Sequence, residues 1–156
     1  MTREILFRGQ TRRYGEKVCV GTGEKIPSRW VYGGVLQGIG AHSIIYGGEN
    51  ANDPSEGFDK WPVYTDTLGE FTGLCDKDGK KIFEGDIVNI LGNQEGADWK
   101  NVNYNALIAF LDGGFCAIDG TIENHGFRRY ALARMDFDLE VIGNKWDNPE
   151  LLEGEG

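Results

Sequence analysis

Short apolar runs, rich in β-branched and aromatic residues and separated by glycine-containing turns, make up most of the chain. Runs of this length and composition predict strands rather than helices. The segments that we expect to be strands, or the extended arms of hairpins, are 4–8, 17–20, 29–36, 43–46, 61–64, 81–83, 87–91, 106–111, 115–118 and 139–142. The hydrophobic pattern therefore predicts a mainly β protein with short helical turns only.

The remaining segments divide into loops and two helical candidates. Residues 47–59 and 92–105 lack periodicity and are predicted to be long loops. Arg128–Met135, with the sequence RRYALARM, has the composition of a helix of about two turns. Asn148 and Pro149 are suited to the N-cap and first position of a single terminal turn ending at Leu152.

Turn chemistry suggests how the strands are joined. Asp78-Gly79 lies between two extended arms and predicts a type I′ hairpin turn. Glu84-Gly85-Asp86 and Asp112-Gly113-Gly114 are two further turns. From Gly85 to Gly143 the order is strand, long loop, hairpin, irregular return and closing strand, as in a small SH3-like barrel, in which closure protects short strands from exposed edges.

The strand pattern also divides the chain into regions. We expect an N-terminal β region at 1–68, packed as an additional β layer, and a C-terminal SH3-type barrel region at 69–152. Residues 153–156 form an acidic tail.

Three blocks of the sequence resemble the YopX family of phage and prophage proteins. The most specific is Phe71–Val88, with its DKDGK hairpin and the FEGDIV start of a strand. The third block joins Glu140–Asn144 to Asn148–Leu152, and a weaker first block joins Arg3–Arg8 to 29–33. The resemblance implies an SH3-like barrel in the C-terminal part and a phage or prophage setting, and it carries over no catalytic residues.

Glycine content and charge narrow the function classes. The 24 glycines among 156 residues are about twice the usual share, which fits many turns between short strands. The net charge of −9 disfavours general binding to phosphate backbones. Residues 1–29 hold seven basic and three acidic residues, whereas 135–156 hold seven acidic residues and one Lys. The two ends are either solvated surfaces or partners of each other, within or between subunits.

Candidate chemistry is sparse. Cys19, Cys75 and Cys116 are far apart in the sequence and form no zinc-binding pattern, so we expect no metal and no cofactor. Their odd number and the lack of a long apolar segment indicate a reducing, cytoplasmic setting, and the resemblance to the YopX family implies that this is the cytoplasm of a bacterial host cell. Cys116 and His125 are the two residues on which a small hydrolase could be based, as nucleophile and base. We assign no function to His42.

Two acidic patterns have structural explanations. Asp76–Gly79 lacks the spacing of a calcium loop, because Gly is its fourth residue and two Lys follow it. Glu84 and Asp86 flank a glycine at a turn, where backbone conformation alone accounts for them.

The aromatic residues Trp30, Tyr32, Trp61 and Tyr64 are the candidate interaction surface. They form either core and cross-strand packing or an interface. We expect a non-enzymatic phage or prophage accessory protein that acts through protein–protein contacts, as a homo-oligomer or with a phage or host protein. Apolar edge strands such as Ala106–Leu111 would favour self-association. The alternative is a role in nucleic-acid transactions, through the basic N-terminal strip or by acidic mimicry of DNA.

Overall fold

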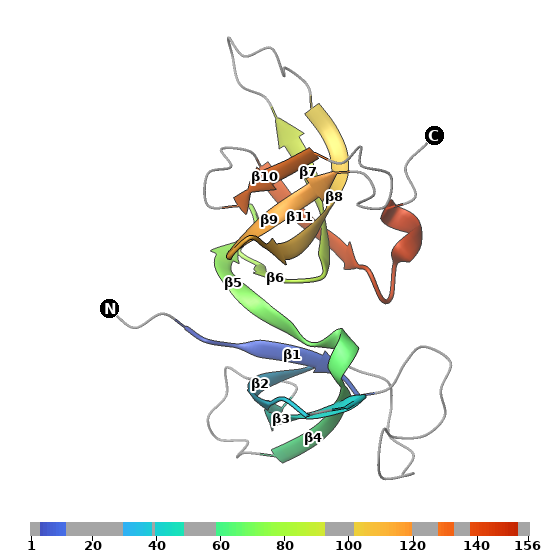
Figure 1. The fold of residues 1–156 in the computed structure, drawn as a ribbon. Coiled ribbons are helices and arrows are strands. Elements are labelled where there is room, and N and C mark those ends of the chain that lie inside the picture. The colour runs from blue at the N-terminus through green and yellow to red at the C-terminus, as the bar shows by residue number, and fades with distance from the viewer. Residues whose placement is uncertain are drawn as a thin grey trace. The chain divides into compact units, whose positions relative to one another are not determined.

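The computed structural model describes residues 4–11, 30–38, 40–48, 59–92, 102–119, 128–132 and 138–152. These residues form antiparallel strands and short 3-10 turns, so the prediction of a mainly β protein is confirmed (Figure 1). None of the described helical turns is long and apolar enough to cross a membrane. The chain divides into two compact units, an N-terminal unit at 1–71 and a C-terminal unit at 72–156.

The N-terminal unit is built from four antiparallel strands in the order β4-β3-β2-β1, with the start of β5 paired to β1. The predicted strands at 4–8, 29–36, 43–46 and 61–64 overlap with β1, β2, β3 and β4. The elements are β1 (Phe7–Gln10), β2 (Trp30–Leu36), β3 (His42–Gly48), β4 (Asp59–Tyr64), the 3-10 turn η2 (Thr65–Thr67) and β5 (Gly69–Cys75).

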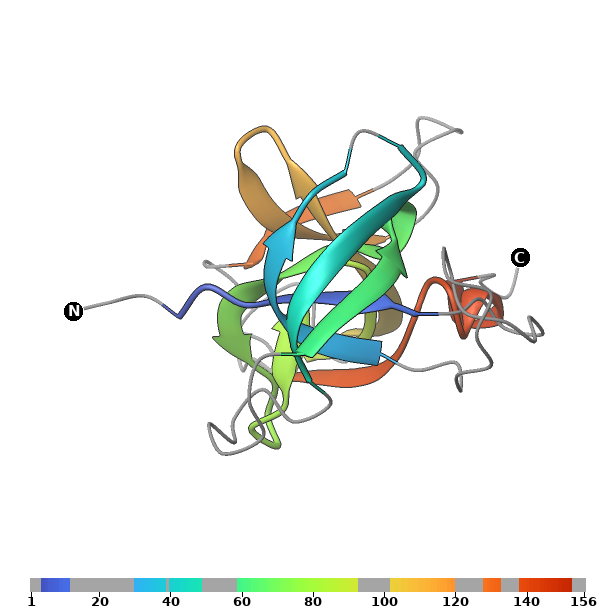
Figure 2. The ribbon, with the colours of Figure 1, turned by 90° about the horizontal axis from the view of Figure 1, so that it is seen from below.

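The core of the N-terminal unit lies on one face of a strongly curled sheet. Val31, Ile45 and Val63 are completely buried there. A Cβ atom added to Gly9 of β1 would lie 2.7 Å from a methyl carbon of Val63 on β4, although two strands separate β1 from β4 in the sheet order. These four strands are seen from below in Figure 2. The curl brings the two outer strands together over a small core.

Glycine at one cross-strand pair permits a close approach of the backbones. Gly33 on β2 lies opposite Gly47 on β3. A Cβ atom on Gly33 would overlap the carbonyl oxygen of Tyr46, and one on Gly47 would overlap that of Tyr32. Any side chain at either position would therefore push β2 and β3 apart.

The C-terminal unit contains a five-stranded antiparallel sheet in the order β10-β9-β8-β7-β11, together with β6 paired to the end of β5. The elements are β6 (Lys81–Phe83), β7 (Asp86–Gly92), β8 (Val102–Leu111), β9 (Gly114–Asp119), β10 (Arg128–Ala131), β11 (Asp138–Asn144) and the 3-10 turn η5 (Pro149–Leu152). Over the described ranges no ladder joins β10 to β11, so the sheet is open and the SH3-like barrel is not confirmed.

One apolar cluster fills the core of the C-terminal unit. Its members alternate along β7, β8 and β9 and include side chains from β6, β11 and the segment after β10. They are Ile82, Val88, Ile90, Ala106, Ile108, Ala117, Leu132 and Leu139. The alternation of apolar residues at 87–91 and 106–111 thus arises because every second side chain of these strands points into the core.

The predicted helix at Arg128–Met135 is wrong in its first half. Arg128–Ala131 form strand β10, which pairs with β9 from Arg128 opposite Asp119 to Ala131 opposite Cys116. Leu132 follows and is buried in the core. Pairing with a neighbouring strand and burial of Leu132 outweigh the local helix preference of these residues, which is a weak determinant.

The predicted loop at 92–105 ends earlier than expected, because β8 begins at Val102. β8 is also not an edge strand, since β7 pairs along one side of it and β9 along the other. The expectation that Ala106–Leu111 has an open edge is therefore wrong. The strand predicted at 17–20 lies outside the described residues.

Two Asp-Gly dipeptides form different hairpin turns. Asp112 and Gly113 both have positive φ, at 52° and 81°, between the paired residues Leu111 and Gly114. This is a type I′ turn. At the other dipeptide Gly79 has a φ of 84°, as the predicted turn requires, but among the described residues Asp112 is the one non-glycine with positive φ.

The type I′ prediction for Asp78-Gly79 is therefore wrong. The amide of Gly79 donates to the carbonyl of Asp76 at 3.0 Å, and the amide of Asp76 donates to the carbonyl of Lys80 at 2.8 Å. A closed four-residue turn whose last residue is a left-handed glycine is the arrangement of a type I turn with a G1 bulge.

The predicted terminal turn is confirmed as η5. The amide of Leu151 donates to the carbonyl of Asn148 at 3.1 Å. The Asn148 side chain accepts a bond from the amide of Asn144 at 3.3 Å, which ties the turn to the end of β11.

Candidate functional site

The N-terminal sheet has a second face, opposite its core, that is dominated by aromatic and apolar side chains. Alternation along β2 points Val31 to the core and Trp30 and Tyr32 to the other side. Cross-strand register extends the second face over β3 and β4. We call it the aromatic face; its members are Trp30, Tyr32, Gly34, Leu36, His42, Ile44, Tyr46, Lys60, Pro62 and Tyr64.

The four predicted interaction residues do not all lie on this face. Trp30, Tyr32 and Tyr64 belong to it and are half-buried. Trp61 pairs with Ile45 and packs against the buried cluster of the unit, so the structure places it on the core face. Core packing thus accounts for Trp61, whereas for the other three residues the interface interpretation stays a prediction.

The sequence also offers residues of this face that the prediction omitted. Leu36, Ile44 and Pro62 form one cross-strand row, with Leu36 58% exposed and the other two half-buried. Tyr46 lies in the next row, between Gly34 and Lys60. The alternation of side chains within 42–46 and 60–64 could have placed these residues on one face of their own strands. Their alignment with β2 depends on the register between strands, which the sequence pattern does not specify.

Several ring contacts support this face. The guanidinium of Arg8, which is only 6% exposed, lies 4.7 Å from the ring centroid of Trp30. The ring of His42 lies 5.3 Å from that of Tyr64, and the ammonium of Lys60 lies 5.9 Å from that of Tyr46. Cation–π and ring–ring contacts of this kind stabilise the orientation of aromatic side chains.

Gly34 has no side chain, and we call its position on the face the notch. This glycine is exposed, its φ lies outside the left-handed region, and a Cβ atom there would meet no atom within 4 Å. Tyr32 and Leu36 are its neighbours on the same side of β2, and Tyr46 is its partner on β3. Because a Cβ atom at Gly34 would meet nothing, a side chain from another molecule can approach the backbone here.

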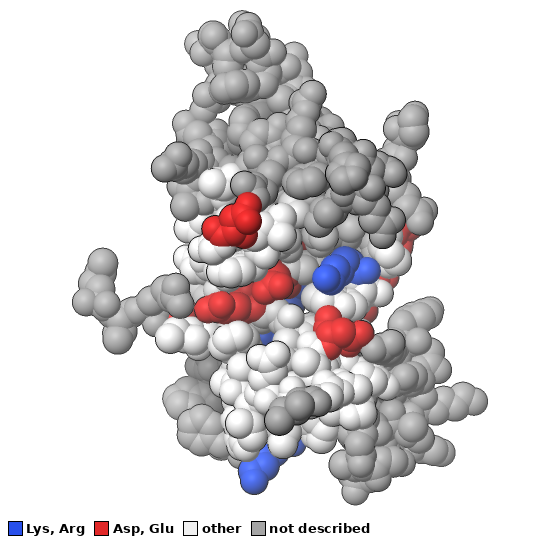
Figure 3. All heavy atoms as spheres, viewed as in Figure 1, with Lys and Arg blue, Asp and Glu red and all other residues white. Residues whose placement is uncertain are grey.

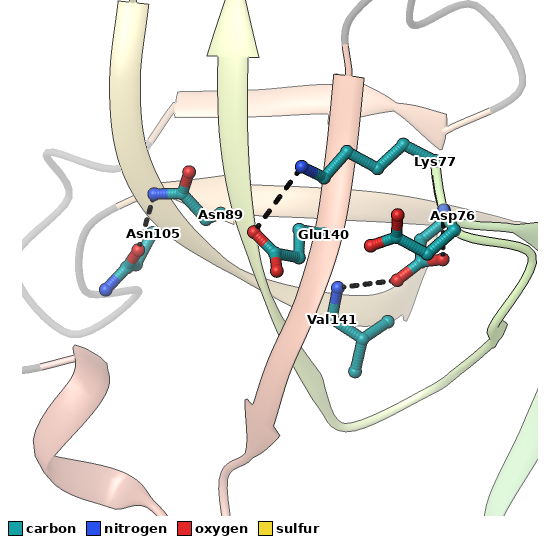
Figure 4. A network of polar contacts seen from close by, with 7 residues as sticks. Asp76, Lys77, Asn89, Asn105, Glu140 and Val141 are labelled. Atoms are coloured by element: carbon teal, nitrogen blue, oxygen red, sulfur yellow. Dashed lines mark hydrogen bonds and ion pairs between the residues drawn. The ribbon is translucent and has the colours of Figure 1, made fainter.

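The C-terminal sheet carries a polar network on its face away from the core (Figure 4). Glu140, Asn89 and Asn105 form one row across β11, β7 and β8. The side-chain amide of Asn89 donates to the side-chain oxygen of Asn105 at 3.0 Å, and that of Asn105 donates to the carbonyl of Leu151 at 3.0 Å. The Lys77 ammonium lies 3.9 Å from the carboxylate of Glu140. The row thus holds η5 against the sheet.

Asp76 is the most constrained carboxylate of this network, and it is 8% exposed. One oxygen accepts bonds from the amides of Asp78 and Lys80, both at 2.9 Å, and the other accepts from the amide of Val141 at 3.0 Å. Burial raises the pKa of Asp76, whereas these three backbone bonds and the positive charge of Lys80 lower it. The lowering outweighs the effect of burial, so the pKa lies below its ordinary value.

The Asp76 bonds fasten the hairpin turn to strand β11. The amide of Lys77 donates to the carbonyl of Leu139 at 2.9 Å, beside the Asp76–Val141 bond. Backbone groups on the outer edge of β11 are thereby satisfied by the turn, as they would be by another strand. The Asp76 carboxylate accepts hydrogen bonds from backbone amides, which agrees with the interpretation of Asp76–Gly79 as a turn. Its role here is to stabilise the fold.

Other candidates are also tied into the fold. The Asp86 carboxylate is 2% exposed and accepts a bond from the amide of Phe83 at 2.8 Å, which closes the turn before β7. Cys116 is 4% exposed and its thiol donates to the carbonyl of Ala109 at 3.5 Å. His125 lies outside the described residues. No three His, Cys, Asp or Glu side chains come together as a metal site among those that the structure places.

Charged side chains are spread over the view in Figure 3. Acidic and basic groups of the described residues both occur there, separated by uncharged surface. No broad basic area is visible on the described part of this view.

The protein is an all-β protein of two units, with an aromatic face on one sheet and a structural polar network on the other. The sequence model described as YopX protein matches residues 27–153, and the chain belongs to the YopX family. No curated protein matches the sequence. A similar solved structure is that of protein EF1440 from Enterococcus faecalis, with 21% sequence identity and a TM-score of 0.49, covering 97% of this chain and 99% of that one.

Proposed function

We propose that the protein is a non-enzymatic accessory protein of phages or prophages that acts in the cytoplasm of the bacterial host cell. It works through protein–protein contacts, and it self-associates through the aromatic face. The observation that carries the proposal is that face, on which apolar and aromatic side chains of three strands stay exposed or half-buried.

The composition of the face supports a role in protein contacts. Interfaces are enriched in Tyr and Trp, and their energetic centres are aromatic anchors surrounded by less important contacts. Trp30 is held by the Arg8 guanidinium and Tyr64 by the His42 ring, so these side chains lose little freedom when a partner binds. Leu36, at 58% exposure, would gain most from being covered.

The non-enzymatic part of the proposal has separate support. Membership in the YopX family supplies no catalytic residues to carry over. The two most buried carboxylates of the described chain, Asp76 and Asp86, accept backbone hydrogen bonds that close turns.

The strand β8 lies in the centre of its sheet, so it offers no open edge for self-association, and the contact that we propose uses the aromatic face.

Sedimentation velocity at low micromolar concentration tests self-association. We expect the wild type to give a mass that is a multiple of 17.3 kDa. Gly34→Glu places a charge in the notch without backbone strain, because φ is ordinary and the space is open, and it should give a monomer. A strictly monomeric wild type at low and high salt would refute self-association.

Gly40→Glu is the matched control for Gly34→Glu. Gly40 is also exposed, and its Cβ atom would also meet nothing within 4 Å, but it lies in the turn before β3 and outside the aromatic face. This variant should associate like the wild type. Equal association of wild type and both variants would show that the contact uses another surface.

A further inference from the structure

The strand positions that form the aromatic face include no acidic residue, although the chain has a net charge of −9. Lys60 and His42 are both exposed on this face. A partner surface that complements the face should therefore combine apolar side chains with carboxylates.

The C-terminal end of the same chain has this composition. Asp147 and Glu150 are exposed, and Leu151 and Leu152 are half-buried in η5. Four residues follow η5, and two of them are Glu. We call residues 147–156 the acidic end; it has four carboxylate side chains, three apolar side chains and no basic side chain.

We propose that the acidic end of one copy docks on the aromatic face of the next copy. The inference rests on the proposed function, because it names the occupant of the face through which the protein self-associates. Carboxylates of the acidic end lie near Lys60, and apolar side chains of the same segment cover the notch at Gly34 and the row of Leu36, Ile44 and Pro62.

Charge favours this contact over one in which two aromatic faces meet. A face-to-face contact would be isologous and would bring together two surfaces on which no strand position supplies a carboxylate. Docking of the acidic end is heterologous and pairs opposite charges. It produces a closed ring or an open chain of copies, depending on the rotation between neighbours.

A charge swap tests the pairing. Lys60→Glu and Glu150→Lys should each weaken self-association, by about tenfold in the dissociation constant, because an exposed attraction becomes a repulsion. The double variant should restore the wild-type value to within about threefold, since the pair is re-formed with opposite polarity. Sedimentation equilibrium over a concentration series measures all four proteins.

Two further proteins complete the experiment. Asp78→Lys changes the net charge by the same amount as Glu150→Lys, at an exposed turn residue outside both surfaces, and should associate like the wild type. A chain ending at Leu152 lacks two carboxylates and should associate more weakly, with a smaller dependence on salt. All of these changes are at exposed positions or beyond η5, so circular dichroism should show unchanged folding.

Each remaining outcome separates the two proposals. If Gly34→Glu abolishes association but Lys60→Glu and Glu150→Lys leave it unchanged, the face is the contact and the acidic end is not its occupant. If both single variants weaken association and the double variant does not restore it, the two residues are not paired and the inference is refuted. A monomeric wild type refutes the proposed self-association itself.

Discussion

The face away from the core differs between the two sheets in how its groups are used. On the C-terminal sheet, Asn105 binds the carbonyl of Leu151 and Asp76 binds the amide of Val141, so polar side chains fasten elements of the same unit. On the N-terminal sheet, Leu36 and its neighbours present apolar surface to solvent. Polar side chains whose hydrogen bonds are satisfied within one unit thus stabilise the fold, whereas exposed apolar surface is what a partner can cover.

The contrast predicts that the largest loss of stability comes from Asp76. Asp76→Ala removes a carboxylate that accepts three backbone bonds and leaves the amide of Val141 without this acceptor. We expect a loss of about 3 kcal/mol in the free energy of unfolding, because bonds to a charged group are worth more than neutral ones. Thermal unfolding measures it, and hydrogen exchange at the Val141 amide should become faster.

Asp78→Ala is the control for this variant, because Asp78 is an exposed neighbour in the same turn. It should change stability by no more than about 0.5 kcal/mol. Equal losses for Asp76→Ala and Asp78→Ala would contradict the structural role given to Asp76.

Gly85→Ala should cost about 2 kcal/mol in the free energy of unfolding. Gly85 has a φ of 90°, and a Cβ atom there would overlap the ring of Trp146. Gly114→Ala is the matched control, because its Cβ atom would meet nothing within 4 Å and its φ is ordinary. Urea unfolding of both variants decides the point, and a loss as small at Gly85 as at Gly114 would count against this packing.

Acid should reduce the contribution of Asp76. Its pKa in the folded protein is lowered, so its stabilising effect is complete above the ordinary carboxyl pKa of about 4 and is lost as the pH falls through the lower folded value. The difference in unfolding free energy between the wild type and Asp76→Asn should therefore shrink in this acid range. A difference that stays constant from neutral pH to pH 2 would show that the charge of Asp76 is not what holds the turn.

The two Asp-Gly turns should respond in opposite directions to one substitution. Asp112 has positive φ, so Asp112→Gly should stabilise by about 0.5 kcal/mol through relief of strain. Asp78 does not have positive φ, so Asp78→Gly should destabilise by a similar amount through the greater freedom of the unfolded chain. Melting temperatures that shift in the same direction for both would contradict the assignment of the two turns.

The position of most strands followed from the sequence, because burial of alternate side chains leaves a direct pattern. Trp30–Leu36, His42–Gly48 and Asp86–Gly92 coincide closely with the predicted runs. Arg128–Ala131 did not follow the rule, since its strand state depends on pairing with β9, a partner that local composition does not specify.

Turn type and the candidate surface were predictable only in part. The Asp-Gly dipeptide indicates a hairpin, but the bonds that the amides of Asp78 and Lys80 donate to the Asp76 carboxylate belong to a different turn from the one that the dipeptide favours. Aromatic residues indicated a surface, but the separation of Trp61 from Tyr64 depends on which face each occupies. The row of Leu36, Ile44 and Pro62 required the register of three strands.

The most direct test of the contrast between the two faces compares Gly34→Glu with Asp76→Ala in two measurements, sedimentation velocity and thermal unfolding. Gly34→Glu should become monomeric and keep the wild-type melting temperature. Asp76→Ala should melt at a lower temperature and, while folded, associate like the wild type. If Gly34→Glu associates normally, or if Asp76→Ala loses association while its fold is intact, the assignment of contact to the aromatic face and of fastening to the polar network is contradicted.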